Sequence, residues 1–140
     1  MNLRYLLDTN IISEAIRPQP SPNVMQQLLS ARSTAAIGSV VWHEVLLGCY
    51  RMPESNRRGI IETYLQEEVK ARLPILPYTE EAAEWFATEQ ARLIPLGLTP
   101  SYADGQIAAI AAVNNLILVT RNVSDYQNFT GLTIENWFDR

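Results

Sequence analysis

Short apolar runs alternate along the chain with longer segments whose apolar residues recur at helical spacing. The strand-like runs are residues 3–7, 34–37, 74–77, 116–120 and 132–134, and the helix-like segments are residues 11–17, 21–32, 40–51, 54–71, 79–93 and 101–113. Short buried strands that alternate with helices are typical of a parallel sheet covered on both faces. The pattern therefore predicts an α/β fold with three layers, α/β/α, and a short-stranded parallel sheet.

Several predicted helices begin with recognisable capping residues. Ser21 precedes Pro22, a pairing that suits an N-cap and the first helical position. Thr79 precedes Glu80 and Glu81, whose charges are favourable in a first helical turn. No repeat, linker or low-complexity segment interrupts the sequence, so we expect residues 1–140 to form a single domain.

Composition narrows the class of protein. Hydrophobic residues make up 47% of the 140 residues and charged residues 19%, which is usual for a globular domain. The single cysteine, Cys49, cannot form an internal disulfide, the most apolar stretch is too short to span a membrane, and residues 1–10 lack the basic region of a signal peptide. We expect a cytoplasmic protein with no membrane partner.

The net charge of −4 argues against a nucleic-acid binder that relies on a basic surface. An acidic protein can still act on nucleic acid if its carboxylates are clustered and neutralised by a divalent metal. The positions of the acids therefore decide this question.

The first predicted strand ends abruptly in polar residues, Asp8, Thr9 and Asn10. Ligands bind open α/β sheets at the carboxyl ends of the strands. The strand at 116–120 ends similarly and leads through Arg121 to Asp125. Asp8 is equally suited to be a helix N-cap, and Asp125 to be part of an ordinary turn.

Two further acids fall on apolar helix faces. Glu44 lies within a stripe marked by Val41, Val45 and Gly48, and Asp104 lies three, four and seven residues before Ile107, Ala108 and Ala111. A buried carboxylate is costly unless it is paired or bound to a cation. The alternatives are that Glu44 is exposed and that Asp104 forms a capping box with Ser101.

The predicted topology brings these acids toward one edge of the sheet, because strand ends and helix starts share that edge. Two carboxylates roughly 4 Å apart repel by about 4 kcal/mol at an effective dielectric constant of 20, so a cluster needs a cation. Oxygen ligands favour Mg²⁺ or Mn²⁺, and the lone His43 and Cys49 are too few for zinc. Such a site suits phosphodiester hydrolysis.

Five motifs in order make the chain resemble a PIN-domain ribonuclease, and closely a VapC-type toxin of a type II toxin–antitoxin system. They are LLDTNIIS at 6–13, SVVWHEVLLG at 39–48, LTPSYADGQIAAIA at 98–111, LVTRNVSDY at 118–126 and GLTIENW at 131–137. The resemblance implies a PIN-like fold and Mg²⁺- or Mn²⁺-dependent endonucleolytic cleavage of RNA. It also implies a homodimer and a cognate antitoxin protein, for which the helices at 21–32 and 54–71 offer a groove.

The resemblance also assigns roles to residues. Asp8, Glu44 and Asp104 match family acids, and we expect Asp8 and Asp104 to bind one metal with Glu44 positioning water or acting as a base. The fourth family acid often directly follows the Thr-Arg pair, where this chain has Asn122, and Asp125 is the other residue that can take its place. Thr9 and Thr120 are expected to line the pocket, and Arg121 to contact a phosphate of the substrate.

Two other classes of function share features with this sequence. Phosphoryl transfer through an aspartyl phosphate would require a second acid at Asn10 and a catalytic lysine, but the only lysine is Lys70. A non-catalytic PIN-fold binding module with a weakened metal site is the alternative that Asn122 favours.

Overall fold

The computed structural model describes residues 2–139 and contains a parallel sheet with helices on both sides. The strands are β1 (Tyr5–Leu7), β2 (Ala35–Gly38), β3 (Ile75–Leu76), β4 (Ile117–Val119) and β5 (Ile134–Glu135), in the spatial order β3-β2-β1-β4-β5. β1 is therefore the central strand, and it pairs in parallel with both β2 and β4.

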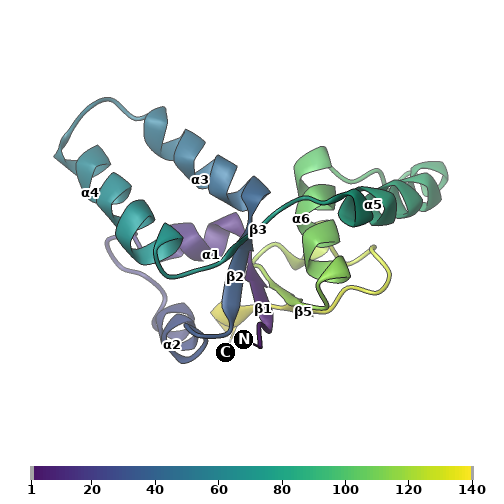
Figure 1. Ribbon diagram of the computed structural model, residues 1–140, viewed down its shortest axis with the longest axis horizontal. Helices are drawn as coiled ribbons and strands as arrows, with labels where there is room; N and C mark the ends of the chain where they lie inside the picture. Colours follow the sequence, from purple (N-terminus) through teal and green to yellow (C-terminus); the bar gives the residue numbers. More distant parts are fainter. Residues whose placement is uncertain (1, 140) are drawn as a thin grey trace.

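The helices form the two outer layers. They are α1 (Thr9–Glu14), α2 (Pro22–Ser30), α3 (Ser39–Tyr50), α4 (Asn56–Tyr64), α5 (Glu80–Leu93) and α6 (Tyr102–Val113). Figure 1 shows α2, α3 and α4 on one side of the strands, with α5 and α6 on the other. Short 3-10 segments follow at η2 (Ile94–Leu96), η3 (Val123–Asp125) and η4 (Trp137–Asp139). The predicted three-layer parallel architecture is confirmed.

The sequence patterns produce these elements for identifiable reasons. Leu6 and Leu7 of β1 are fully buried, as a central strand covered on both faces requires. Ser21, Thr79 and Ser101 each cap a helix by accepting a hydrogen bond from a backbone N–H three residues on. The capping predictions for Ser21 and Thr79 are therefore confirmed.

The segment predicted as one long helix at 54–71 is divided in the structure, so this prediction was wrong in detail. α4 ends at Tyr64 and is followed by a π-helical segment, η1 (Leu65–Lys70). Ile61, Leu65 and Val69 are all buried, and each is four residues from the next, a spacing that places side chains on one helix face. The buried stripe therefore continues from α4 into the π-helical segment.

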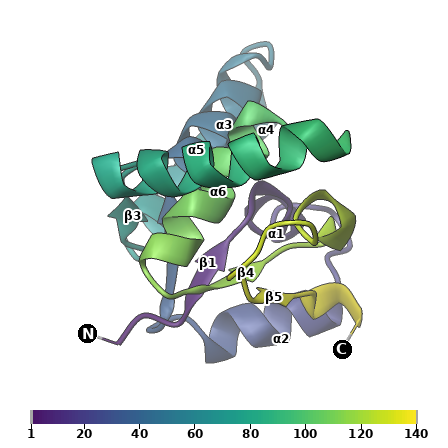
Figure 2. The same ribbon diagram turned by 90° about the vertical axis from the view of Figure 1, so that its right-hand side faces the viewer.

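Close packing of α5 against α6 fixes the start of α6, and Figure 2 shows α5 lying across α6. A Cβ atom added at Gly105 would stand 1.9 Å from Cζ of Phe86. Only a glycine permits this approach, and it directly follows Asp104. Within residues 2–139, no helix is long and apolar enough to cross a membrane.

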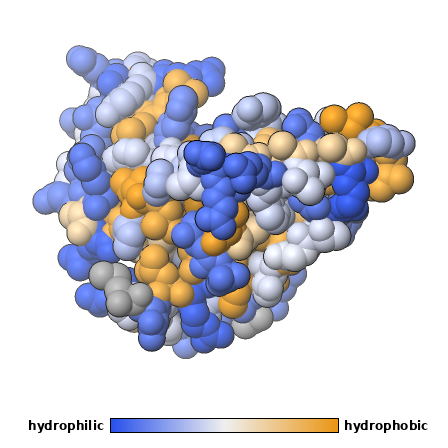
Figure 3. Space-filling model, turned by 45° about the vertical axis from the view of Figure 1, so that its right-hand side comes forward, coloured by the Kyte–Doolittle hydropathy of each residue, from blue (hydrophilic) through white to orange (hydrophobic). Residues whose placement is uncertain are grey.

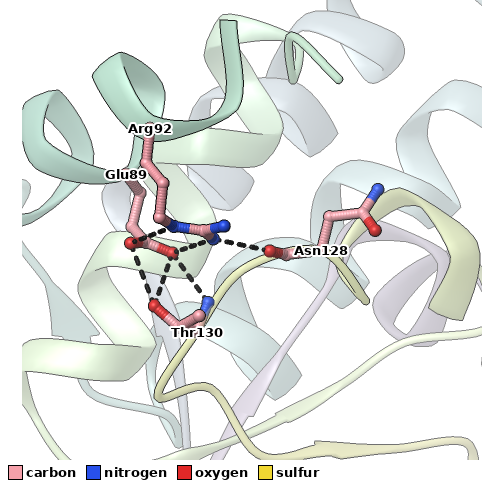
Figure 4. A network of polar contacts seen from close by, with 4 residues as sticks. All are labelled: Glu89, Arg92, Asn128 and Thr130. Carbon is pink, nitrogen blue, oxygen red and sulfur yellow. Dashed lines mark hydrogen bonds and ion pairs between the residues drawn. The ribbon is translucent and has the colours of Figure 1, made fainter. Parts of the chain in front are cut away.

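A buried glutamate, paired with an exposed arginine, ties α5 to the loop that follows η3 (Figure 4). Glu89 is only 6% exposed and accepts hydrogen bonds from Nη2 of Arg92 at 2.9 Å and from the backbone N–H of Thr130 at 2.7 Å. Arg92 also donates to the backbone carbonyl of Asn128 at 2.8 Å. The hydrogen bonds from Arg92, followed by those from Thr130, hold the pKa of Glu89 below its ordinary value.

We expect Glu89→Gln to lower the free energy of unfolding by about 2 kcal/mol, because charge-assisted hydrogen bonds are lost. Since the folded-state pKa of Glu89 is lowered, its contribution is present above the unfolded-state pKa and is lost as pH falls through the folded-state value. The difference between wild type and variant should therefore shrink in acid. Urea denaturation at several pH values measures it.

Glu84→Gln is the control, because Glu84 lies exposed on the same helix. Its stability should match that of the wild type within about 0.5 kcal/mol. Equal effects of the two substitutions would show that the Glu89 network does not stabilise the loop.

Candidate active site

Asp8 lies directly after β1, where its carboxylate is 5% exposed. Its Oδ1 accepts a hydrogen bond from the backbone N–H of Thr9 at 2.8 Å, which makes Asp8 the N-cap of α1. Its Oδ2 accepts hydrogen bonds from Oγ1 of Thr120 at 2.8 Å and from the hydroxyl of Tyr126 at 3.1 Å. Asp8 is therefore the N-cap of α1, and its other carboxylate oxygen belongs to a buried polar cluster.

Asn10 and Thr120 join the ends of β1 and β4 beside Asp8. Nδ2 of Asn10 lies 3.3 Å from Oγ1 of Thr120, and Oδ1 of Asn10 accepts a hydrogen bond from the backbone N–H of Arg121 at 3.1 Å. The backbone N–H of Asn122 donates to Oγ1 of Thr120 at 3.0 Å. The two strand ends are thus linked by side chains as well as by the sheet.

Asp104 occupies the first turn of α6, as the capping interpretation requires, but its carboxylate faces the cluster. Its backbone N–H donates to Oγ of Ser101 at 3.1 Å, while its Oδ1 lies 3.2 Å from the Tyr126 hydroxyl. Ser101 is therefore the cap, and the Asp104 carboxylate remains available for the site. One hydroxyl group separates it from Asp8.

Glu44 reaches the cluster through Thr9. It is half-buried on α3, and its Oε1 accepts a hydrogen bond from Oγ1 of Thr9 at 2.6 Å. Because Thr9 follows Asp8 directly, this hydrogen bond links Glu44 to the residue next to Asp8. A cavity of about 310 Å³ borders this point and includes Thr9 and Glu44 in its lining.

Burial and neighbouring charges shift the pKa values of Asp8 and Tyr126. Burial raises the pKa of Asp8 above its ordinary value, hydrogen bonds from Thr120, Thr9 and Tyr126 lower it, and the charge of Asp104 raises it further. Burial and the neighbouring carboxylates of Asp8 and Asp104 raise the pKa of Tyr126. Tyr126 is therefore a neutral phenol that donates its hydrogen.

In the structure, the carboxylates of Asp8 and Asp104 both lie within hydrogen-bonding distance of the Tyr126 hydroxyl. Glu44 accepts a hydrogen bond from Thr9, the residue that follows Asp8. Across residues 2–139, no group of three or more His, Cys, Asp or Glu residues is placed to hold one metal ion. Asp125 is exposed in η3 and lines a hollow of about 340 Å³ together with Asp104. Asn122 is also exposed, and its backbone N–H rather than its side chain supports Thr120.

The three residues expected at the substrate lie at different depths. Thr120 is fully buried and donates a hydrogen bond to Asp8, whereas Thr9 is half-buried. Arg121 is exposed, and its guanidinium lies 4.6 Å from the ring centroid of Phe138. Arg121 is thus the side chain of these three that is free to meet solvent or a polyanion.

Sequence reasoning did not assign a role to Tyr126. Its ring is buried, so its place after Asp125 resembles that of an ordinary core aromatic residue. The hydroxyl is what distinguishes it from phenylalanine, and only the fold shows that this hydroxyl meets two acids.

Comparisons with known proteins agree with this geometry. The model of the PIN domain family matches residues 5–126. The chain belongs to the PIN-domain family. A VapC ribonuclease of Sinorhizobium fredii is 31% identical, with 94% of this chain and 95% of that protein covered. A tRNA(fMet)-specific endonuclease VapC of Shigella flexneri is 30% identical, with 96% and 98% covered. These relatives place this PIN domain among the VapC-type members.

Solved structures show the same fold over the whole chain. The complex FitAcB from Neisseria gonorrhoeae contains a chain that is 27% identical, with a TM-score of 0.90 and with 97% of this PIN domain and 99% of that chain covered. A chain of VapBC2 from Rickettsia felis, bound to a promoter DNA fragment, is 26% identical with a TM-score of 0.83. The PIN fold predicted from the motifs is confirmed.

PIN-domain ribonucleases as a family imply dependence on a divalent metal, and the donor atoms of this site suit one. Asp8, Asp104 and Glu44 offer carboxylate oxygens, and hydroxyl groups of threonine and tyrosine surround them. Hard divalent cations prefer such oxygen ligands. The cluster has no cationic side chain hydrogen-bonded to Asp8 or Asp104 among residues 2–139, so its charge balance favours an added cation.

We expect Asp8→Asn to raise the free energy of unfolding of the metal-free protein at pH 7, because the substitution removes a buried charge that has no cationic partner in the described part of the chain. The folded-state pKa of Asp8 is raised, so the ionised carboxylate destabilises the fold above that pKa, and this cost disappears as pH falls through it. The gap between variant and wild type should therefore close in acid. Chemical denaturation in a metal chelator measures both effects.

Glu67→Gln is the matched control, because it removes an exposed charge from η1, far along the chain from the site. It should leave stability unchanged at every pH. A loss of stability in Asp8→Asn at pH 7 would contradict the argument, since it would show that the hydrogen bonds to Asp8 outweigh the cost of its burial.

Proposed function

We propose that this protein is a metal-dependent endoribonuclease, the toxin component of a VapC-type toxin–antitoxin pair, which hydrolyses RNA phosphodiester bonds. The observation that supports this most directly is the meeting of Asp8 and Asp104 on one hydroxyl at the carboxyl edge of a PIN-domain sheet. The ribonuclease and endonuclease names of its VapC relatives agree with this chemistry.

Asp8 and Asp104 are the residues that would hold the metal, and their oxygen donors favour Mg²⁺ or Mn²⁺. When bound, such an ion lowers the pKa of a bound water and stabilises negative charge on the phosphate. Glu44 is held by Thr9 through Oε1, which leaves Oε2 to position a water or to accept its proton. Thr120 and Asn10 keep Asp8 in place throughout.

Asp125 is the better candidate for the role of the fourth family acid. It shares a hollow with Asp104, whereas Asn122 carries no charge and contributes a backbone N–H to Thr120. Arg121 would contact a phosphate of the RNA, because its side chain is exposed next to Thr120. Its hydrogen bond to Asn10 comes from the backbone N–H and not from the guanidinium. With a net charge of −4, the protein needs local contacts of this kind to hold a polyanion.

We expect Asp104→Asn to reduce cleavage of total cellular RNA by on the order of 100-fold in Mg²⁺ or Mn²⁺, because one metal-binding carboxylate is lost. Because Ser101 rather than Asp104 caps α6, the variant should keep its fold. Gel analysis of the RNA measures cleavage, and circular dichroism checks folding.

Glu54→Gln, which removes an exposed charge outside the site, should cleave like the wild type. If well-folded wild-type protein cleaves no RNA with either metal, the catalytic proposal is wrong. The chain would then act as a non-catalytic PIN-fold binding module.

We also propose that a cognate antitoxin segment binds a groove between α2 and η1. The groove has a volume of about 450 Å³ and is lined by Met25, Leu28 and Leu29 from α2 and by Val69 and Leu73. Arg32, Arg72 and Glu68 border it. Leu29 is 65% exposed and Met25 is 37% exposed, so two neighbouring apolar side chains of this groove are open to a partner. The complexes FitAcB and VapBC2 among the structural relatives support a partner of this class.

We expect Leu29→Glu to weaken binding of a co-expressed antitoxin by at least about tenfold, because it places a charge in an apolar groove. RNA cleavage should be unchanged, since Leu29 is 65% exposed on α2, a helix that supplies none of the residues of the acidic cluster. Gln26→Glu adds the same charge to the same helix outside the groove and should bind normally. Equal binding by both variants would exclude this groove.

A homodimer remains part of the proposal. Apolar side chains are exposed at Leu47 and Tyr50 on α3 and at Ile94 and Leu96 in η2. Figure 3 shows apolar surface at the far end of α5, where η2 lies. Such exposed apolar groups suit contact with a second copy of the chain.

A further inference from the structure

The hydroxyl of Tyr126 lies between the two acids that would hold the metal. It stands 3.1 Å from Oδ2 of Asp8 and 3.2 Å from Oδ1 of Asp104, and the residue is 1% exposed. A phenol has one hydrogen to donate, so the two carboxylates share a single donor. This contact connects the end of β1 to the start of α6.

The two acids depend on this hydroxyl to different extents. Asp8 also accepts hydrogen bonds from Thr9 and Thr120, and Asn10 lies 3.4 Å from its Oδ2. For Asp104, the hydroxyl of Tyr126 is the hydrogen-bond partner of the carboxylate within residues 2–139. The direction of the Asp104 side chain therefore depends on Tyr126, whereas Asp8 is fixed without it.

Tyr126 is itself held from several directions. Its backbone N–H donates to the carbonyl of Val123 at 3.0 Å, and its carbonyl accepts from the N–H of Phe129 at 3.2 Å. The rings of Tyr126 and Phe129 lie 6.5 Å apart between centroids. The loop beyond is fastened to α5 by the bonds between Glu89 and Thr130. The hydroxyl thus occupies a fixed position that a solvent water would not.

We propose that Tyr126 is a positioning residue, whose hydroxyl sets the Asp104 carboxylate against Asp8 before the cation binds. The proposal rests on the proposed metal-dependent function. Without the hydroxyl, two like charges would face each other with no shared donor, and Asp104 would turn toward the polar hollow that it lines with Asp125. The cation would then have to order Asp104 as it binds, which weakens its affinity.

The test is a calorimetric titration of Mn²⁺ into wild-type protein, Tyr126→Phe and Tyr64→Phe. Tyr126→Phe removes the hydroxyl and keeps the buried ring. Tyr64→Phe is the matched control, because the Tyr64 hydroxyl donates to the backbone carbonyl of Ile12 at 3.0 Å rather than to an acid. The Kd for Mn²⁺ should rise on the order of tenfold in Tyr126→Phe and stay within twofold of the wild type in Tyr64→Phe.

A second readout separates positioning from catalysis and from folding. At saturating Mn²⁺, Tyr126→Phe should cleave RNA at close to the wild-type rate, whereas the Mn²⁺ concentration for half-maximal cleavage should rise in parallel with the Kd. Thermal denaturation in a chelator should show both tyrosine variants folded. A merely structural role for Tyr126 would lower the denaturation temperature without changing the Kd, and this result would overturn the proposal.

Three other outcomes also contradict the inference. Unchanged or tighter Mn²⁺ binding by Tyr126→Phe would show that the hydroxyl does not help to assemble the site. Equal weakening in both tyrosine variants would point to a general loss of rigidity. If the wild type binds no Mn²⁺ and cleaves no RNA, the proposed function itself fails, a result distinct from a failure confined to Tyr126.

Discussion

Burial of the Asp8 carboxylate is the constraint on which the rest of the site depends. An acid that is 5% exposed must have its oxygens satisfied, and here the donors come from three separate parts of the chain: Thr9 at the start of α1, Thr120 after β4 and Tyr126 after η3. The parallel register that sets Leu7 beside Val119 places Asp8 next to Thr120. A slip of one residue would turn the Thr120 side chain to the other face of the sheet and leave Asp8 without its shortest side-chain hydrogen bond.

The buried Asp8 carboxylate lowers the stability of the folded protein, although its position suits a metal site. Hydrogen bonds reduce the cost of burying Asp8 but do not cancel it, because burial and the charge of Asp104 still raise its pKa. A domain with a purely structural polar cluster would gain by replacing one of the acids or by adding a cationic side chain. Asp8 and Asp104 share one hydrogen-bond donor, the Tyr126 hydroxyl. This pairing of two acids has a physical reason if a bound cation balances their negative charges during function.

Much of the fold follows from local signals in the sequence. The apolar runs predict β1 to β5 to within a few residues, and Ser21 and Thr79 mark helix starts because capping is a contact between residues three apart. The division of 54–71 into α4 and η1 was not predictable from spacing alone, because it depends on which face meets the core. The approach of Asp8 and Asp104 to one another follows from topology, since strand ends and helix starts share an edge. The role of Tyr126 does not, because its hydroxyl reaches Asp8 across 118 positions of sequence.

The same distinction bears on the fourth acid of the family pattern. By sequence position, Asn122 stands where a carboxylate is common, and the site therefore looks weakened. In the fold, Asp125 at the end of η3 lines a hollow with Asp104. The next residue, Tyr126, places its hydroxyl within hydrogen-bonding distance of both Asp8 and Asp104. One short segment thus supplies a charge on its exposed side and a hydrogen-bond donor on its buried side. Hydrogen bonds from Thr130 to the buried Glu89 fasten the loop beyond this segment to α5, so an acid outside the site supports the position of Tyr126.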